Sequence, residues 1–302
     1  MKKSLIMVVV SLFASCFSIT LGQTTPEGVR TPPSVLLIVR EDIKPGMMPV
    51  HNRHSAAYAG LFNKLQTRNH RIAMVPVAGS ENEVLYVTAG ESFADLEKIT
   101  LETDKKLSTV SGSMSAELDH LDKEAPDLHA GMRDMLAVYR PELSYKPGAD
   151  IAQMRYFAVT TVRVRPGQED QYAENVRTLV NVARDKAKAE IHVAAYQIIA
   201  GSPATTYLFF RPMKSLAEYD LRVGPRVREA MSEDQRKKTD KLTSESVMFT
   251  ETSVYAFNPR MSYLSKEFTA GDPSFWNPKS EAVARPKPKR RTPKPTPPPA
   301  AQ

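Results

Sequence analysis

Cysteine and tryptophan are nearly absent from this 302-residue chain, which contains one of each. A single cysteine excludes a disulfide scaffold, a cysteine-rich zinc module and an iron–sulfur cluster. The chain also lacks a glycine-rich phosphate loop of the P-loop or dinucleotide type, which argues against the common nucleotide-binding folds. Hydrophobic residues nevertheless make up 41% of the chain, which is enough to form a buried core.

A net positive charge is lacking in the body of the chain, although the whole chain carries a net charge of +7. Two lysines at the start add +2, and residues 279–302 contain seven bases and one acid, which adds +6. Residues 23–278 therefore carry a net charge of −1. Because the body has no basic excess, we predict no specific nucleic-acid partner.

Residues 1–22 have the pattern of an export signal. A basic start precedes a short apolar run, Leu5–Phe13, and small residues lead to a cleavage point before Gln23. The segment Phe13–Cys16 also resembles a bacterial lipobox, so lipid anchoring at Cys16 is the alternative to cleavage before Gln23. Both interpretations predict an exported protein of bacterial type, periplasmic or extracellular.

The C-terminal residues 279–302 are rich in proline, lysine and arginine and have little apolar surface. This composition predicts a solvated, extended segment rather than a packed one. A disordered, solubilising tail is the simpler interpretation. The alternative is a basic arm that contacts anionic envelope polymers, lipid headgroups or a partner domain.

The middle of the chain contains one series of landmarks twice. A strand-like run ends in Pro-Gly, a helix-like stretch follows, and an apolar strand then ends in Gly-Ser. The Pro-Gly steps at 45–46 and 166–167 are 121 residues apart, and Tyr86 and Tyr207 have the same spacing. Each copy continues with a serine, Ser92 or Ser215, that we expect to cap the next helix.

Each copy therefore predicts the split β-α-β pattern of a ferredoxin-like unit with an extra helical segment. Such a sheet carries helices on one face only, so its other face needs a cover. We predict an α+β fold in which two tandem ferredoxin-like repeats close their antiparallel sheets into an intramolecular barrel. The repeats are placed at 34–146 and 155–264, the linkers at 23–33 and 147–154, and a C-terminal extension at 265–278.

The repeat resembles the dimeric α/β-barrel superfamily, which includes antibiotic-biosynthesis-monooxygenase-like and NIPSNAP-like domains. The matching features are the strand–Pro-Gly–helix openings, the Gly-Ser turns and the helix starts at Ser92 and Ser215, over about residues 34–263. Two such domains pair into a closed barrel in that superfamily, so the resemblance implies an intramolecular pair here. Its members include oxygenases, isomerases, haem enzymes and proteins without known activity, so it implies no particular reaction.

His51, His54 and Tyr58 share one face if their segment is helical. If that face lines the barrel mouth, the histidines could bind a metal or haem iron, or move protons near neutral pH. A metal would need a third ligand, which the sequence does not identify. The alternative is a partly exposed helix start with no ligand. We interpret the charge-rich segment 119–129, which contains His120 and His129, as solvated surface.

Tyr86, Tyr207 and Arg211 are the other pocket candidates. Strand alternation places Tyr207, Phe209 and Arg211 on one face. An aromatic-lined cavity with an arginine suits a small apolar or aromatic acid. Alternatively, the tyrosines pack the sheet against helices.

The leading functional prediction is an exported small-ligand-binding or interaction protein, monomeric or homodimeric. One alternative is a cofactor-independent monooxygenase or isomerase that uses the barrel lumen. A further alternative is a structural envelope protein attached through its basic tail. No cofactor or metal site is predicted, although a single histidine would suffice as an axial ligand of haem.

Overall fold

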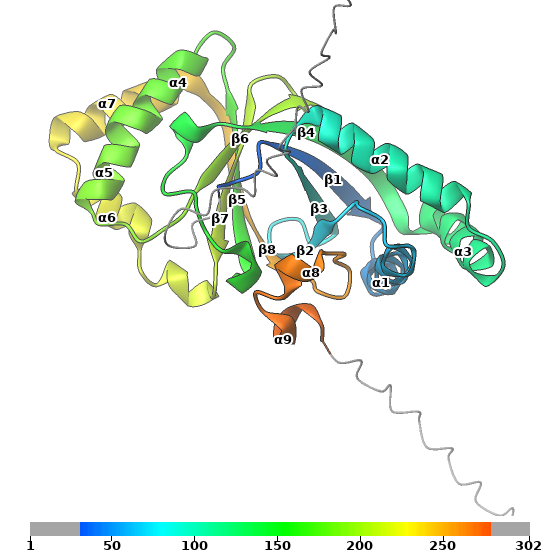
Figure 1. Ribbon diagram of the computed structural model, residues 1–302. Helices are drawn as coiled ribbons and strands as arrows, with labels where there is room; N and C mark the ends of the chain where they lie inside the picture. Colours follow the sequence, from blue (N-terminus) through cyan, green and yellow to red (C-terminus); the bar gives the residue numbers. More distant parts are fainter. Residues whose placement is uncertain (1–30, 279–302) are drawn as a thin grey trace, which may run out of the picture.

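The computed structural model describes residues 31–278, in which two groups of helices flank a central barrel (Figure 1). The predicted export signal with Cys16, the cleavage point at Gln23 and the predicted tail 279–302 lie outside the described residues. Within 31–278, no helix combines the length and the apolar character needed to cross a membrane.

Eight antiparallel strands form a closed barrel in the order β1-β3-β2-β8-β5-β7-β6-β4. The first four strands adjoin as β4-β1-β3-β2, and the last four repeat this order as β8-β5-β7-β6. We call these sets the first and second half-sheets; they join through β2–β8 and β4–β6. The predicted α+β class with antiparallel sheets that close into a barrel is thus confirmed. The strands are β1 (Val35–Ile43), β2 (Arg71–Ala78), β3 (Glu83–Gly90), β4 (His129–Tyr139), β5 (Tyr156–Val164), β6 (Ala194–Ala200), β7 (Thr206–Met213) and β8 (Val247–Phe257).

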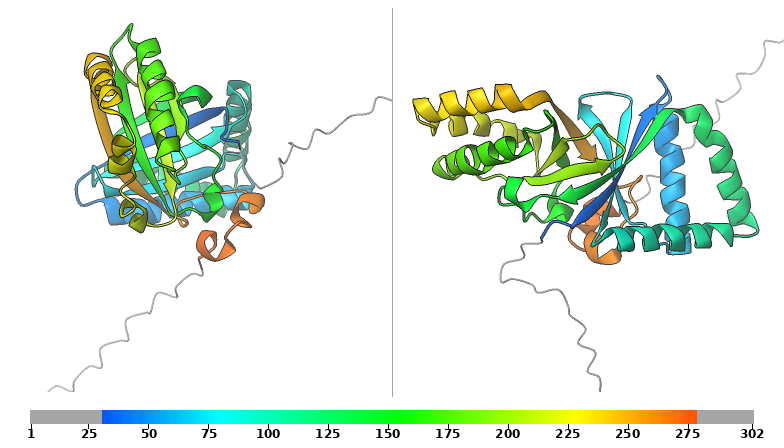
Figure 2. Two further views of the ribbon diagram at one scale, coloured as in Figure 1. Left: turned by 90° about the vertical axis from the view of Figure 1, so that its left-hand side faces the viewer. Right: turned by 90° about the horizontal axis from the view of Figure 1, so that it is seen from above.

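The helices lie outside the barrel, in one group on each side (Figure 2). The first half-sheet is covered by α1 (Met48–Leu65), α2 (Phe93–Ser108) and α3 (Ser113–Leu128). The second half-sheet is covered by α4 (Glu169–Asn175), a π-helix (Val176–Val180), α5 (Asn181–Lys186), α6 (Val223–Glu229) and α7 (Glu233–Ser246). The short elements are the 3-10 turns at Pro141–Leu143, Ile151–Gln153 and Leu216–Tyr219, with α8 (Lys266–Thr269) and α9 (Pro273–Trp276).

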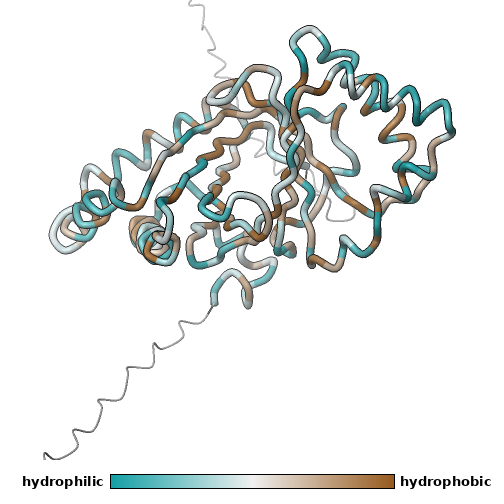
Figure 3. The backbone as a smooth tube through the Cα atoms, turned by 180° about the vertical axis from the view of Figure 1, so that it is seen from behind, coloured by the Kyte–Doolittle hydropathy of each residue, from teal (hydrophilic) through white to brown (hydrophobic). Residues whose placement is uncertain are grey.

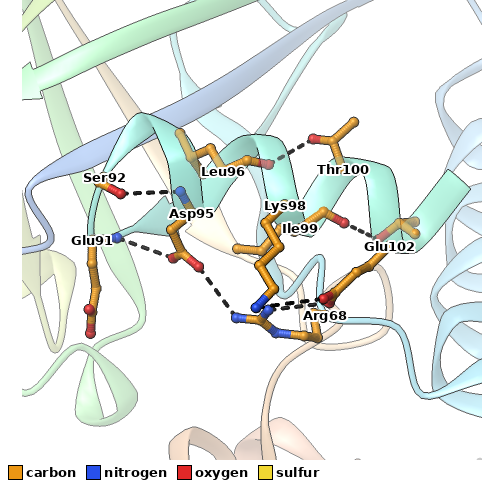
Figure 4. Close-up of polar contacts among 10 residues, drawn as sticks. Arg68, Glu91, Ser92, Asp95, Leu96, Lys98, Ile99, Thr100 and Glu102 are labelled. Carbon is orange, nitrogen blue, oxygen red and sulfur yellow. Dashed lines mark hydrogen bonds and ion pairs between the residues drawn. The ribbon is translucent and has the colours of Figure 1, made fainter.

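The second helix starts at a cap that the sequence predicts. Ser92 Oγ accepts a hydrogen bond from the backbone N–H of Asp95 at 3.1 Å (Figure 4). The Arg68 guanidinium then pairs with Asp95 at 3.3 Å and with Glu102 at 3.2 Å, which fastens α2 to the segment after α1. Ser215 caps the 3-10 turn Leu216–Tyr219 in the same way, so both predicted caps are confirmed.

Alternate strand positions fill the barrel with apolar side chains. The outer helices contain many hydrophilic residues (Figure 3). Trp276 of α9 closes the end of the barrel that lies at the bottom of Figure 1, which we call the lower end. Its Nε1 donates to the carbonyl of Ala152 at 2.8 Å. The extension 265–278 is therefore part of the folded unit. Interior side chains include Leu36, Ile38, Met74, Leu85, Met135, Phe157, Val159, Ile198, Leu208, Phe210 and Phe257.

Two cavities remain in the lumen. The upper one has about 130 Å³ and is crossed by an ion pair between Arg40 and Glu83 at 2.5 Å, with Tyr255 donating to the same carboxylate. The lower one has about 410 Å³, is mostly apolar, and has His70 and Arg71 in its wall. The lumen is therefore divided rather than one continuous pocket.

Candidate functional site

A cavity of about 490 Å³ lies outside the barrel, between the second half-sheet and its helices. Its floor comes from β5, β7 and β8, and its roof from α4, the π-helix, α5 and α6. This volume lies within the range of small-molecule sites. We call it the second-half cavity. Its apolar lining includes Val162, Tyr172, Val176, Val180, Ile191, Val193, Phe209, Val223, Val227 and Val247.

Two partly buried arginines introduce positive charge into this apolar lining. Arg184 donates to Asn181 Oδ1 at 2.8 Å. Burial lowers the pKa of Arg184, the nearby charge of Arg211 lowers it further, and Tyr172 and Tyr145 oppose that change. A guanidinium held in such surroundings favours a bound anion.

Arg211, one of the predicted residues, is incompletely satisfied. Its guanidinium lies 3.4 Å from the backbone carbonyl of Glu218 and 3.6 Å from that residue's carboxylate, which is a long contact. Its Nε–H has no hydrogen-bond partner although it is buried. Arg211 therefore has a donor available for a ligand.

Asn175 provides a matching acceptor and is only 2% exposed. Its Nδ2 donates to Thr243 Oγ1 at 3.3 Å, but its Oδ1 has no partner. A buried polar atom without a partner costs about 1–3 kcal/mol. A ligand hydroxyl in the cavity would remove that cost.

The roof helix is irregular where it meets the cavity. The π-helix Val176–Val180 directly follows Asn175 and adds a wide turn between α4 and α5, whereas α1 on the other side runs unbroken over 18 residues. Both Val176 and Val180 line the cavity. Single π-turns inside α-helices are frequent at functional sites.

Tyr207 and Tyr86 pack sheet against helix, which was the alternative interpretation for them. Tyr207 contacts the Tyr172 ring of α4 at 5.9 Å and belongs to a buried cluster. Tyr86 donates to Ser55 Oγ of α1 at 2.7 Å, and the Arg71 guanidinium lies 4.5 Å from its ring centre. Burial raises the pKa of both tyrosines.

The sheet register also corrects the predicted match between these tyrosines. Glu41 and Val162 both lie two residues before the end of their strands, yet Glu41 faces Val84 and Val162 faces Tyr207. Tyr207 therefore corresponds to Val84 and not to Tyr86. The displacement of two residues has two sources. The second copy has one extra residue between the end of its first strand and the end of its second, 36 from Val164 to Ala200 against 35 from Ile43 to Ala78. It has one more in the hairpin, where five residues join β6 to β7 and four join β2 to β3.

His51 and His54 are buried under α1 on the helix side of the first half-sheet, 0% and 6% exposed. The expectation of a partly exposed helix start is therefore wrong, and neither histidine lines the lumen cavities. His54 Nε2 donates to the carbonyl of Leu121 at 2.9 Å, and Tyr58 donates to Asp122. These two contacts fasten α1 to α3. Burial and the bond to Asp122 raise the pKa of Tyr58.

His51 instead meets two residues that sequence reasoning missed. Its Nε2 lies 2.7 Å from Glu41 Oε2 on β1, and His129 Nε2 at the start of β4 lies 3.3 Å from the same oxygen. Burial would raise the pKa of Glu41, but the hydrogen bond and charge of His51, together with His129 and Arg71, lower it overall. Treating His129 as solvated surface was wrong, whereas His120 is indeed 70% exposed.

No family model and no curated protein matches the sequence. Solved structures with a related fold include a proposed monooxygenase from Fusobacterium nucleatum subsp. nucleatum ATCC 25586, with 11% identity, 76% of this chain and 94% of that chain covered, and a TM-score of 0.45. An anthrone oxidase-like protein has 10% identity, covers 75% and 92%, and has a TM-score of 0.46. A mutant chlorite dismutase from Candidatus Nitrospira defluvii has 11% identity, covers 76% and 93%, and has a TM-score of 0.44.

Each of these structures has a low identity to this chain and a TM-score below 0.5. At such identities and TM-scores they carry no argument about ligand or reaction. The class that the fold and site define is a closed antiparallel barrel with a helix-covered cavity, and the chemistry must be argued from the residues themselves.

Proposed function

We propose that this protein binds a small amphipathic acid in the second-half cavity. Three features carry the proposal. The donor Arg211 Nε–H is buried without a partner, the acceptor Asn175 Oδ1 is also buried without a partner, and both residues line a mostly apolar cavity of about 490 Å³. An acid with an apolar or aromatic body and a hydroxyl group matches all three features. No other described cavity combines them.

The expected position of such a ligand follows from the lining. Its carboxylate would accept from Arg211 and lie in the field of Arg184, while its hydroxyl would donate to Asn175. Its body would contact the valine-rich wall and Phe209. Hydrogen bonds to charged groups contribute about 1.5–3 kcal/mol each, so the acid should bind at least tenfold more tightly than its neutral amide.

The test is isothermal titration calorimetry with salicylate and salicylamide, which differ only in the acid. We expect binding of salicylate that weakens about 10- to 100-fold in Arg211→Gln. Arg177→Gln is the matched control, because Arg177 lies in the π-helix of the cavity roof but its side chain is 64% exposed. Equal affinity for acid and amide, or wild-type affinity in Arg211→Gln, would exclude the proposal.

We extend the proposal to an exported protein made of two ferredoxin-like copies of one duplicated unit. It is supported by the signal-like residues 1–22 and by the matching strand order of the two half-sheets. The basic tail would then contact anionic envelope components. The mass of the protein from its native host tests the export claim: a chain that starts at Gln23 or a lipidated Cys16 supports it, and an intact Met1 end refutes it.

The enzymatic alternative is favoured by one observation in the lumen. Burial lowers the pKa of His70, although Glu267 opposes this, so a neutral imidazole lies in the wall of the lower lumen cavity near pH 7. A cofactor-independent isomerase or oxygenase would use it as general base. The enzymatic hypothesis predicts that the protein turns over a substrate and that His70→Gln abolishes this turnover. Turnover that is unchanged in His70→Gln would rule out His70 as the general base.

A further inference from the structure

We propose that Glu41, His51 and His129 form a binding site for one divalent transition-metal ion on the helix side of the first half-sheet. The three residues come from β1, from α1 and from the junction of α3 with β4. One ligand atom from each lies within 4.8 Å of the others. Two imidazoles and a carboxylate form the donor set of catalytic zinc and non-haem iron sites.

The distances are close to those of a coordinated ion. Glu41 Oε2 is 2.7 Å from His51 Nε2 and 3.3 Å from His129 Nε2. Ligand atoms on a tetrahedral zinc ion, each about 2.0–2.1 Å from the metal, are about 3.4 Å apart. The carboxylate and both rings therefore need only side-chain adjustments to share an ion.

The hydrogen bonding of His129 presents a lone pair to this site. Its Nδ1 lies 2.7 Å from the carbonyl of Ala125, which can only accept, so Nδ1 carries the hydrogen. In the neutral ring, Nε2 is then an acceptor that faces the carboxylate oxygen of Glu41. Two facing acceptors need a cation or a proton between them. A backbone carbonyl on the far ring nitrogen is the usual support of a metal-ligating histidine.

The two ring nitrogens of His51 have different surroundings. It is fully buried, and its Nδ1 has no hydrogen-bond partner. Its Nε2 is also 3.3 Å from Ser55 Oγ, which accepts from Tyr86. Ser55 and Tyr86 thus place hydroxyl groups beside the nitrogen of His51 that would bind the ion, whereas its other ring nitrogen has no second-shell partner.

The second half of the fold shows that charge is not needed at these positions. Each of the three residues has an equivalent at the same place in the matching element. Glu41 lies two residues before the end of β1, His51 is the fourth residue of α1, and His129 is the first residue of β4. The matching elements are β5, α4 and β8. In the second half these positions hold Val162, Tyr172 and Val247, which line the second-half cavity.

Apolar and aromatic residues therefore occupy the equivalent positions in the second half of the fold. Replacing a buried ionic group by apolar side chains is often neutral or stabilising, so stability alone does not account for the three polar residues. A protonated imidazole pair around Glu41 is the competing explanation, and it requires no metal.

The experiment uses the full chain, stripped with EDTA, and titrates it with Zn²⁺ by calorimetry and with Co²⁺ by visible absorption. We expect one ion per chain and the ligand-field bands of a nitrogen–oxygen site. Glu41→Gln and His129→Gln should each weaken Zn²⁺ binding at least tenfold and remove the Co²⁺ bands. His120→Gln is the matched control, because His120 lies exposed on α3.

Circular dichroism of each variant checks that it folds, and either glutamine variant alone decides the question. Wild type that binds no stoichiometric Zn²⁺, or binding that is unchanged in the glutamine variants, would overturn the metal site in favour of the protonated pair. Neither result bears on salicylate binding, because the helices that line the second-half cavity and the helices beside the metal site lie on opposite sides of the barrel (Figure 2).

Discussion

Asn175 should limit the stability of the ligand-free protein, and replacing it should expose a conflict between stability and binding. Its Oδ1 is buried without a partner, and its Nδ2 makes one long hydrogen bond of 3.3 Å to Thr243. Asn175→Leu keeps the branching of the side chain at Cγ, removes the unpartnered oxygen and adds apolar contact with the cavity wall. The substitution should therefore stabilise the empty protein.

The size of the effect follows from two opposing contributions. Removing the unsatisfied oxygen gains about 1–3 kcal/mol, and losing the bond to Thr243 costs about 0.5–1.5 kcal/mol. We expect Asn175→Leu to raise the free energy of unfolding by about 1 kcal/mol. In a domain of this size the midpoint of thermal unfolding then rises by about 2–4 °C.

The assay is urea denaturation followed by circular dichroism, together with salicylate titration. Asn181→Leu at the start of α5 is the matched control, because both polar atoms of Asn181 are satisfied, by Arg184 and by the carbonyl of Ser144. It should lose about 1–3 kcal/mol. If Asn175→Leu destabilises the empty protein as Asn181→Leu does, or binds salicylate as wild type does, the reasoning about the cavity fails.

Two further predictions concern the barrel. Trp276→Ala should lower the free energy of unfolding by about 3–5 kcal/mol in urea denaturation, because it empties the plug at the lower end of the barrel; a loss below about 1 kcal/mol would contradict that role. The lowered pKa of His70 means that the unfolded chain binds more protons than the folded chain below the usual histidine pKa of 6.5. Stability contributed by His70 should therefore be lost as pH falls from about 6.5, and His70→Gln should flatten the dependence between pH 7 and pH 5; identical profiles would refute it.

Local patterns in the sequence predict much of the fold. The Pro-Gly steps precede α1 and α4, and Ser92 and Ser215 cap the elements after β3 and β7. These features depend on residues a few positions apart, so they can be read without knowing the tertiary structure. The succession of strands and helices in each copy follows from the same patterns.

The polar residues around each site depend on contacts that no local pattern shows. Glu41 and His129 are brought together only by the pairing of β1 with β4. Asn175 and Arg184 lie in a stretch without glycine or proline, so nothing in the sequence indicates the π-helix between them. Arg211 was found from the sequence because strand alternation alone sets its direction.

The register error has a similar origin. A spacing of 121 residues matched Tyr86 with Tyr207, but the second copy has one extra residue before its hairpin and one within it, so β7 is displaced by two residues relative to β3. Repeat spacing measures position along the chain, whereas the ladder of hydrogen bonds fixes which side chains are neighbours.

The most direct test of the account is a crystal structure of the protein soaked with salicylate. We predict difference density in the second-half cavity, with the carboxylate within hydrogen-bonding distance of Arg211 Nε and the hydroxyl beside Asn175 Oδ1. Density in the lower lumen cavity beside His70 instead, or an empty second-half cavity at saturating salicylate, would contradict the proposed function.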